Sequence, residues 1–138
     1  MIECVLDASV VATWMLGNPA DARTIAASAL IEARGERAIH APEFLGVEVA
    51  NALWKAVRFA GLDVRAASRS IDALPHLGLQ LHPNAPLAAA ALELACRKTI
   101  SAYDASYVVL ARSLRLPLVT ADLKLVRSMA AADVVPLA

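Results

Sequence analysis

CVLDASV, residues 4–10, is the stretch that decides the fold. A short apolar run leads directly into Asp7, and a second apolar run begins three residues later. This pattern predicts a buried strand over residues 2–6, followed by a helix over residues 10–16 with Ser9 as its N-cap. Aspartate is itself common at helix entries, but if Ser9 caps this helix the Asp7 carboxylate is free for another role.

Outward from this stretch, short apolar runs alternate with longer helical patterns. Four further strands are predicted over residues 37–40, 79–81, 117–120 and 134–135. The predicted helices cover residues 20–34, 42–60, 63–74, 83–98, 101–114 and 122–129, with Pro42 as the first residue of its helix. This alternation implies an α/β fold in which a parallel sheet is covered on both faces, with the working site beyond the C-terminal ends of the strands.

The composition is that of a globular chain, with 138 residues, 59% of them hydrophobic and 4% aromatic. One domain over residues 1–138 is long enough to bury a core without disulfides. The most apolar stretch, residues 85–92, is too short to span a membrane, and the start of the chain lacks the basic region of a signal peptide. We therefore expect a cytoplasmic protein with no membrane partner, in which Cys4 and Cys96 are buried free thiols.

Four carboxylates carry the candidate chemistry. Each lies in a mostly apolar stretch, at the end of a predicted strand or at the start or along the edge of a predicted helix. They are Asp7, Glu48, Asp104 and Asp122. A fold that brings them together would concentrate negative charge, which is tolerable if a divalent cation binds there. Hard oxygen ligands of this kind suit Mg²⁺ or Mn²⁺. Because Asp7 and Asp122 both follow predicted strands, the sequence places this metal site at one edge of the sheet.

Glu48 and Asp104 have structural alternatives that local spacing leaves open. Glu48 flanks the apolar stripe of its helix, and Lys55 or Asn51 is near enough in the sequence to pair with it. Ser101 and Asp104 match the S-x-x-D capping-box pattern, so the Asp104 side chain could simply satisfy the start of a helix.

Asp122 could likewise cap the helix that it begins, and Thr120 could share that task. The case for a site is therefore the joint pattern of four acids. Other chemistry is poorly represented: the three histidines lack zinc-site spacing, and no phosphate-binding glycine loop or G-x-S-x-G elbow is present. Tyr103 and Tyr107 are expected on the core-facing side of their helix.

The formal net charge is zero, which at first argues against a nucleic-acid partner. With four of the 13 acidic residues set aside as ligands, the 13 basic residues exceed the remaining acids by four. Part of this excess could face phosphates, although each residue could equally lie on an ordinary solvated helix face. The residues in question are Arg58, Arg65, Arg69, Arg97, Lys98, Arg112, Arg115, Lys124 and Arg127.

In this order, these residues resemble the PIN domain and, within that superfamily, the compact VapC-type toxin ribonucleases. The resemblance spans nearly the whole chain. It rests on VLDASV with Asp7 and Ser9, EFLGVEVANAL with Glu48 and Asn51, SAYDASYVVLA with Asp104, and LVTADLKL with Thr120 and Asp122.

The resemblance implies a three-layer α/β/α sandwich around a short parallel sheet, with the four carboxylates as catalytic metal ligands for Mg²⁺ or Mn²⁺. Ser9, Asn51 and Thr120 would be supporting residues. The implied activity is that of a metal-dependent endoribonuclease, the toxin of a toxin–antitoxin pair, which hydrolyses phosphodiester bonds in tRNA or rRNA and inhibits translation. The implied partners are a small cognate antitoxin and a second copy in a homodimer.

Two other functions stand as alternatives. A phosphatase of the haloacid dehalogenase type also has an aspartate after its first strand, but it needs a second aspartate two residues later, where this chain has Ser9. A non-catalytic PIN-like module that binds RNA or protein usually has lost one or more of the acids, and none is lost here.

Overall fold

The computed structural model describes residues 3–35, 38–131 and 133–137. Within these residues, five strands form one sheet of order β3-β2-β1-β4-β5, and every neighbouring pair is parallel. The strands are β1 (Cys4–Leu6), β2 (Ile39–Pro42), β3 (Gln80–His82), β4 (Leu118–Thr120) and β5 (Val134–Pro136).

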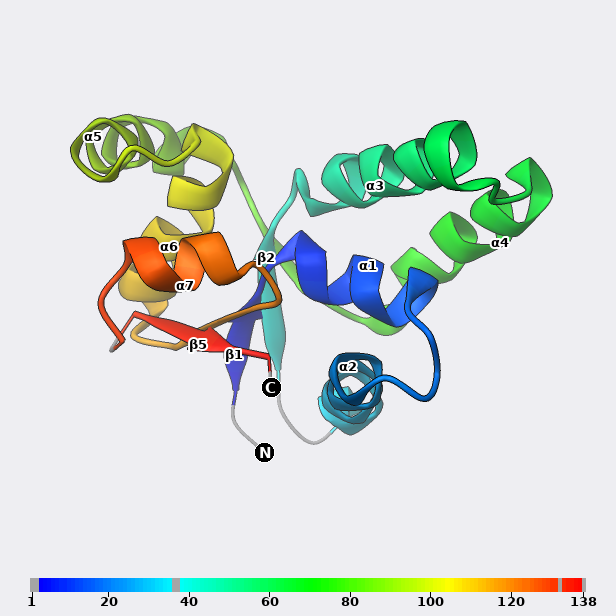
Figure 1. Ribbon diagram of the computed structural model, residues 1–138. Helices are drawn as coiled ribbons and strands as arrows, with labels where there is room; N and C mark the ends of the chain where they lie inside the picture. Colours follow the sequence, from blue (N-terminus) through cyan, green and yellow to red (C-terminus); the bar gives the residue numbers. More distant parts are fainter. Residues whose placement is uncertain (1–2, 36–37, 132, 138) are drawn as a thin grey trace.

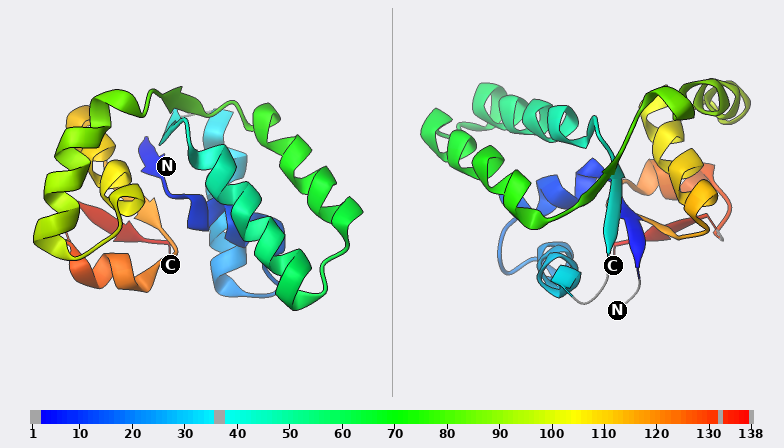
Figure 2. Two further views of the ribbon diagram at one scale, coloured as in Figure 1. Left: turned by 90° about the horizontal axis from the view of Figure 1, so that it is seen from above. Right: turned by 180° about the vertical axis from the view of Figure 1, so that it is seen from behind.

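Helices connect the strands and cover the sheet on both sides. They are α1 (Ala8–Leu16), α2 (Ala22–Glu32), α3 (Leu45–Ala60), α4 (Val64–Ala73), α5 (Ala88–Lys98), α6 (Ala102–Leu114) and α7 (Leu123–Ser128). Helices α1 to α4 lie on one side of the sheet and α5 to α7 on the other (Figure 1), and the views from above and behind agree (Figure 2). The predicted three-layer α/β/α sandwich is confirmed. In the described stretches, no helix has both the length and the apolarity to cross a membrane.

The strand order determines where a ligand can bind. From β1 the sheet extends through β2 to β3 on one side, and through β4 to β5 on the other. Because all strands are parallel, their carboxyl ends lie at one edge, and the order reverses between β1 and β4. Open α/β sheets bind ligands in the crevice at such a switch point. Asp7 follows β1 directly and Thr120 ends β4, so both residues lie there.

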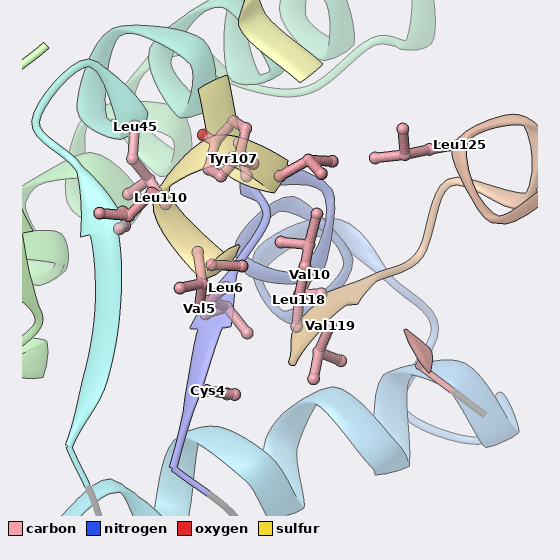
Figure 3. Packing of buried hydrophobic residues seen from close by; sticks show 14 of the residues in the cluster. Cys4, Val5, Leu6, Val10, Leu45, Tyr107, Leu110, Leu118, Val119 and Leu125 are labelled. Atoms are coloured by element: carbon pink, nitrogen blue, oxygen red, sulfur yellow. The ribbon is translucent and has the colours of Figure 1, made fainter. Parts of the chain in front are cut away.

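The core is centred on β1, which is buried along its whole length. Val5 and Leu6 pack with Val10 and Leu118 around the β1–β4 pair, and all four are fully buried (Figure 3). Tyr107 of α6 is the largest fully buried side chain in the described part of the chain. Burial on both faces explains why the central strands read as continuous apolar runs rather than as an alternating pattern.

Two predicted helix starts are wrong. α1 begins at Ala8, and the N-cap position is occupied by Asp7 in extended conformation (φ −76°, ψ 148°), without a side-chain capping bond. Ser9 therefore lies inside the helix. Pro42 ends β2 instead of opening α3, because it pairs with His82 of β3 and the next residue donates the following ladder hydrogen bond. A proline without an N–H fits at such a strand end.

Two burial predictions are also wrong. Cys4 is buried as expected, but Cys96 is exposed, since it lies on the solvent side of α5. Tyr107 is in the core, whereas Tyr103 is 60% exposed. Tyr103 belongs to the first turn of α6, at the end of the helix next to the carboxyl edge of the sheet.

Gly17 follows α1 where the chain passes close to α2, and it generates the first testable prediction. A Cβ atom added there would overlap the Thr24 hydroxyl and the Thr13 carbonyl oxygen. We predict that Gly17→Ala lowers the free energy of unfolding by about 1–3 kcal/mol, the usual cost of overpacking, as measured by urea denaturation. In the control, Gly46→Ala, a new Cβ would meet Leu74 at an ordinary 3.7 Å. That variant should be neutral or gain up to about 1 kcal/mol from helix propensity; equal stabilities of the two variants would contradict the prediction.

Candidate metal centre

Asp7 occupies the junction of β1 and α1 at the switch point. Its backbone N–H donates to the Val119 carbonyl oxygen at 3.0 Å, which extends the β1–β4 pairing by one residue. The residue is only 5% exposed. Burial raises the pKa of the Asp7 carboxyl, and hydrogen bonds from Thr120 and Ser9 only partly offset this rise.

Two hydroxyl groups hold one oxygen of the Asp7 carboxylate. Thr120 Oγ1 donates to Asp7 Oδ2 at 2.6 Å, and Ser9 Oγ donates to the same oxygen at 2.7 Å. Thr120 Oγ1 in turn accepts the backbone N–H of Asp122 at 3.0 Å. Ser9 Oγ accepts the backbone N–H of Ala121, also at 3.0 Å. Both hydroxyl protons are therefore directed at Asp7 Oδ2, while Asp7 Oδ1 has no side-chain hydrogen bond within the described residues.

Asp122 caps α7, as the structural alternative anticipated. Its Oδ1 accepts the backbone N–H groups of Lys124 at 2.9 Å and Leu125 at 3.4 Å. Both bonds use the same oxygen, so Oδ2 forms no hydrogen bond to the described part of the chain. The charge of Asp122 also raises the pKa of Asp7 and of Asp104. Capping a helix and facing the carboxylate cluster are thus compatible for this residue.

Glu48 lies in the first turn of α3, partly buried. Its Oε1 atom is fully buried and has no hydrogen-bond partner among the described residues, and neither Lys55 nor Asn51 pairs with it there. Burial raises the pKa of Glu48; the nearby Tyr107 hydroxyl lowers it, and the charges of Asp7 and Asp104 raise it further. The Tyr107 hydroxyl is also buried, and it forms no hydrogen bond with the described residues. An unpaired buried carboxylate oxygen is costly unless a proton or a cation compensates it.

Asp104 lies in the first turn of α6, where the capping alternative is only half fulfilled. The Ser101 hydroxyl accepts the backbone N–H of Asp104 at 3.0 Å, so the cap uses the main chain of Asp104. Burial, followed by the charges of Asp7 and Asp122, raises the pKa of the Asp104 carboxyl to about 6. Ser101 and Lys124 oppose this rise without cancelling it. Capping therefore does not account for the Asp104 carboxylate.

Asp7 and Asp104 each interact electrostatically with the other three predicted carboxylates, so all four belong to one charged region at the switch point. As the side chains stand, no three acids, histidines or cysteines in the described ranges are close enough together to hold a metal ion. The donor chemistry nevertheless fits Mg²⁺ or Mn²⁺. Among the described residues, one oxygen each of Asp7 and Asp122 accepts no side-chain hydrogen bond, and Glu48 Oε1 is buried without a partner. The charges of neighbouring acids raise the pKa of Asp7, Glu48 and Asp104, and a bound cation would offset that repulsion.

Three residues have placements that the sequence did not reveal. Tyr107 is buried as predicted, but its hydroxyl also approaches Glu48. The sequence signal for a place near the carboxylates was the spacing of three residues between Asp104 and Tyr107 on one helix. Lys124 was only one of several basic residues, yet its charge acts directly on Asp104. Asn51 is exposed and lines a pocket with Glu48.

The histidines form a separate arrangement. His40 is buried and shares hydrogen bonds with His82 (Nδ1–Nε2, 3.0 Å) and with Glu3 (Nε2–Oε1, 2.7 Å), while His76 is exposed. Their prediction as core or surface residues is therefore confirmed. The pairing of His40 with His82 joins adjacent strands across 42 residues, a separation that local spacing does not reveal.

The PIN domain family model matches residues 4–130. The chain belongs to the PIN domain family. Ribonuclease VapC1 of Mycobacterium tuberculosis is 36% identical over 126 residues, which cover 91% of this chain and 90% of VapC1. The crystal structure of PAE2754 from Pyrobaculum aerophilum superposes with a TM-score of 0.73 at 27% identity, covering 99% of this chain and 91% of that one. A toxin–antitoxin complex from Klebsiella pneumoniae gives a TM-score of 0.66 over 99% of this chain and 98% of that one; its 18% identity supports a likeness of fold alone.

The raised pKa of Asp104 predicts that its charge destabilises the metal-free fold. The folded carboxyl holds its proton up to about pH 6, against an ordinary value of 3.8. Its contribution to stability is therefore greatest at low pH and falls as the pH rises from about 4 to about 6. We predict that Asp104→Asn raises the free energy of unfolding in chelator at about pH 7 by about 1 kcal/mol, after allowance for solvent screening. Urea denaturation should show this gain shrinking towards pH 4.

Asp133 supplies a control of opposite sign. A hydrogen bond from Arg112 at 2.9 Å holds the pKa of the Asp133 carboxyl below its ordinary value. Asp133→Asn should therefore lower the stability at about pH 7, by up to about 1 kcal/mol. A loss of stability in both variants would show that the Asp104 carboxylate is stabilising, contrary to the prediction.

Proposed function

We propose that this protein is a metal-dependent endoribonuclease of the VapC type, which hydrolyses phosphodiester bonds in tRNA or rRNA and so inhibits translation. The observation that carries the proposal is the cluster of four carboxylates at the switch point, with Glu48 Oε1 buried and unpaired. Membership of the PIN family and 36% identity to a ribonuclease over most of both chains support it. Residues 1–138 would act as one PIN domain in the cytoplasm.

Each residue of the site has a distinct part in this proposal. The four carboxylates would hold one or two Mg²⁺ or Mn²⁺ ions. When bound, the ion supplies Lewis-acid activation of the scissile phosphate and of the attacking water. Ser9 and Thr120 fix the orientation of the Asp7 carboxylate by donating to Oδ2, and Oδ1 would then be available to the ion. Loss of a residue that orients a metal ligand in this way typically lowers metal affinity or activity by about 10–100-fold.

Lys124 supports the binding of a polyanion at this acidic site. It lies in the first turn of α7, is exposed, and its charge lowers the pKa of Asp104. A phosphate that approaches the carboxylates would therefore meet a positive charge beside them, and Lys–phosphate contacts are a main source of RNA affinity. The zero net charge of the chain is consistent with a locally favourable approach of this kind.

Removal of the Asp7 charge tests the catalytic part of the proposal. Asp7→Asn keeps an oxygen for the Ser9 and Thr120 hydroxyls but weakens the metal ligand, so we predict at least about a 100-fold loss of Mn²⁺-dependent cleavage of total RNA. The fold, followed by circular dichroism, should be unchanged. Asp63→Asn is the matched control, because Asp63 is an exposed N-cap without a side-chain capping bond. Wild-type cleavage by Asp7→Asn would sink the assignment.

Direct metal binding separates the proposal from its alternatives. Calorimetric titration with Mn²⁺ should show binding to the wild type, weakened by Glu48→Gln because a buried ligand oxygen loses its charge. A wild-type protein that binds no Mn²⁺ would instead be the non-catalytic PIN-like module. The phosphatase alternative is already disfavoured, since Ser9 donates its hydroxyl to Asp7 and cannot replace a second aspartate.

The proposed partners are a small antitoxin and a second copy of the chain. Trp54 and Phe59 of α3 and Val64 of α4 are more than half exposed, and α3 and α4 enclose an apolar groove of about 310 Å³. Exposed apolar surface of this kind is typical of protein-binding sites. Co-purification with the product of a small adjacent reading frame would identify the antitoxin, and light scattering of the isolated protein would measure the homodimer.

A further inference from the structure

A pocket of about 440 Å³ adjoins the carboxylate cluster. It is lined by Phe44, Val47, Glu48, Asn51 and Tyr103. Its volume lies within the range of sites that hold small organic groups, about 300–1,000 Å³. Because Glu48 belongs both to this lining and to the cluster, the pocket opens directly beside the proposed reaction centre.

Tyr103 is an exposed but restrained aromatic ring. It is 60% exposed, and its ring packs against that of Phe44 at 5.4 Å and 78°, an edge-on arrangement. Phe44 in turn packs edge-on against the buried Tyr107, at 5.4 Å and 85°. The Tyr103 ring is therefore positioned from the core side while most of it faces solvent. It also lines a second hollow of about 400 Å³, so the ring stands between two recesses of the surface.

Asn51 adds a polar group to the same pocket. It lies one turn after Glu48 on α3 and is exposed, and its side-chain amide makes no hydrogen bond within the described residues. A primary amide carries both donor and acceptor atoms. The pocket thus combines an aromatic face, an aliphatic wall from Val47 and an unused amide.

This combination matches an unpaired base of RNA. Single-stranded RNA is recognised by stacking its bases on aromatic side chains and by hydrogen bonds to the base edges. A base is uncharged, so it can lie beside Glu48 where a second phosphate could not. We propose that the pocket binds one unpaired nucleobase next to the scissile phosphate, stacked on Tyr103 and hydrogen-bonded by the Asn51 amide. This rests on the proposed ribonuclease function and makes Tyr103 and Asn51 specificity residues.

Abasic substitution in a short unstructured RNA tests the stacking contact. At one position beside the cut, removal of the base should raise the wild-type KM roughly 10-fold, a typical loss for one stacked base. Tyr103→Leu should raise KM by a similar factor on the intact RNA with little change in kcat, and show no further rise on the abasic RNA. Tyr103→Phe should behave as the wild type, and Asn51→Ala should change the base preference at that position. Leu92→Ala, at an exposed apolar residue of α5, should have no effect.

The effect of Tyr103 on RNA binding can also be measured without cleavage, in the Asp7→Asn background. Fluorescence anisotropy of the same RNA with Mn²⁺ gives the affinity. If the double variant Asp7→Asn/Tyr103→Leu binds the RNA more weakly than Asp7→Asn alone, the base pocket is supported. This holds even if the wild type cuts no RNA, a result that would reject only the nuclease function. Cleavage by the wild type together with an unchanged KM in Tyr103→Leu overturns the pocket and keeps the nuclease. The absence of any RNA binding overturns both.

Discussion

The hydrogen bonds from Ser9 and Thr120 to one buried oxygen of Asp7 are the interaction on which the rest of the site depends. A carboxylate at the end of a buried strand loses its hydration, and two hydroxyl donors replace part of it. Because these hydroxyls accept backbone N–H groups from the segment after β4, the same four bonds join β1, α1, β4 and the start of α7. The switch point of the sheet and the orientation of its central carboxylate are thus fixed together.

Hydrogen bonds stabilise the charged form of Asp7, whereas burial and the repulsion between the carboxylates oppose ionisation of the cluster. Burial and mutual repulsion raise the pKa of Asp7, Glu48 and Asp104, whereas Asp133, which faces Arg112 elsewhere on the surface, has a lowered pKa. An acid with a structural role usually has a basic partner, as Asp133 has in Arg112. Neighbouring acids whose pKa values are raised by burial and by one another's charge are typical of functional sites, where stability is given up for chemistry.

The sequence predicted most of what depends on local pattern. Apolar runs located the strands. The predicted end of a helix at residue 60 is confirmed, because Gly61 closes α3 in the left-handed conformation (φ 74°) that glycine favours. The predictions that were wrong depend on contacts far along the chain. Ser9 is a sound N-cap by type, but its hydroxyl is bound to Ala121, 112 residues away. The exposure of Tyr103 likewise follows from where α6 begins relative to the sheet. The unpaired oxygen of Glu48 follows from how the first turn of α3 packs, and neither feature is encoded in spacing.

The contact between Thr120 and Asp7 spans 113 residues, which bears on when the site exists during synthesis. Domains begin to fold from the N-terminus as they leave the ribosome, and contacts between distant residues form last. A nascent chain that has released β1, α3 and α6 still lacks β4, and with it both the Thr120 hydroxyl and the Asp122 carboxylate. The proposed arrangement of carboxylates therefore cannot form before residues 118–122 have left the ribosome, so the site is among the last parts of the domain to assemble.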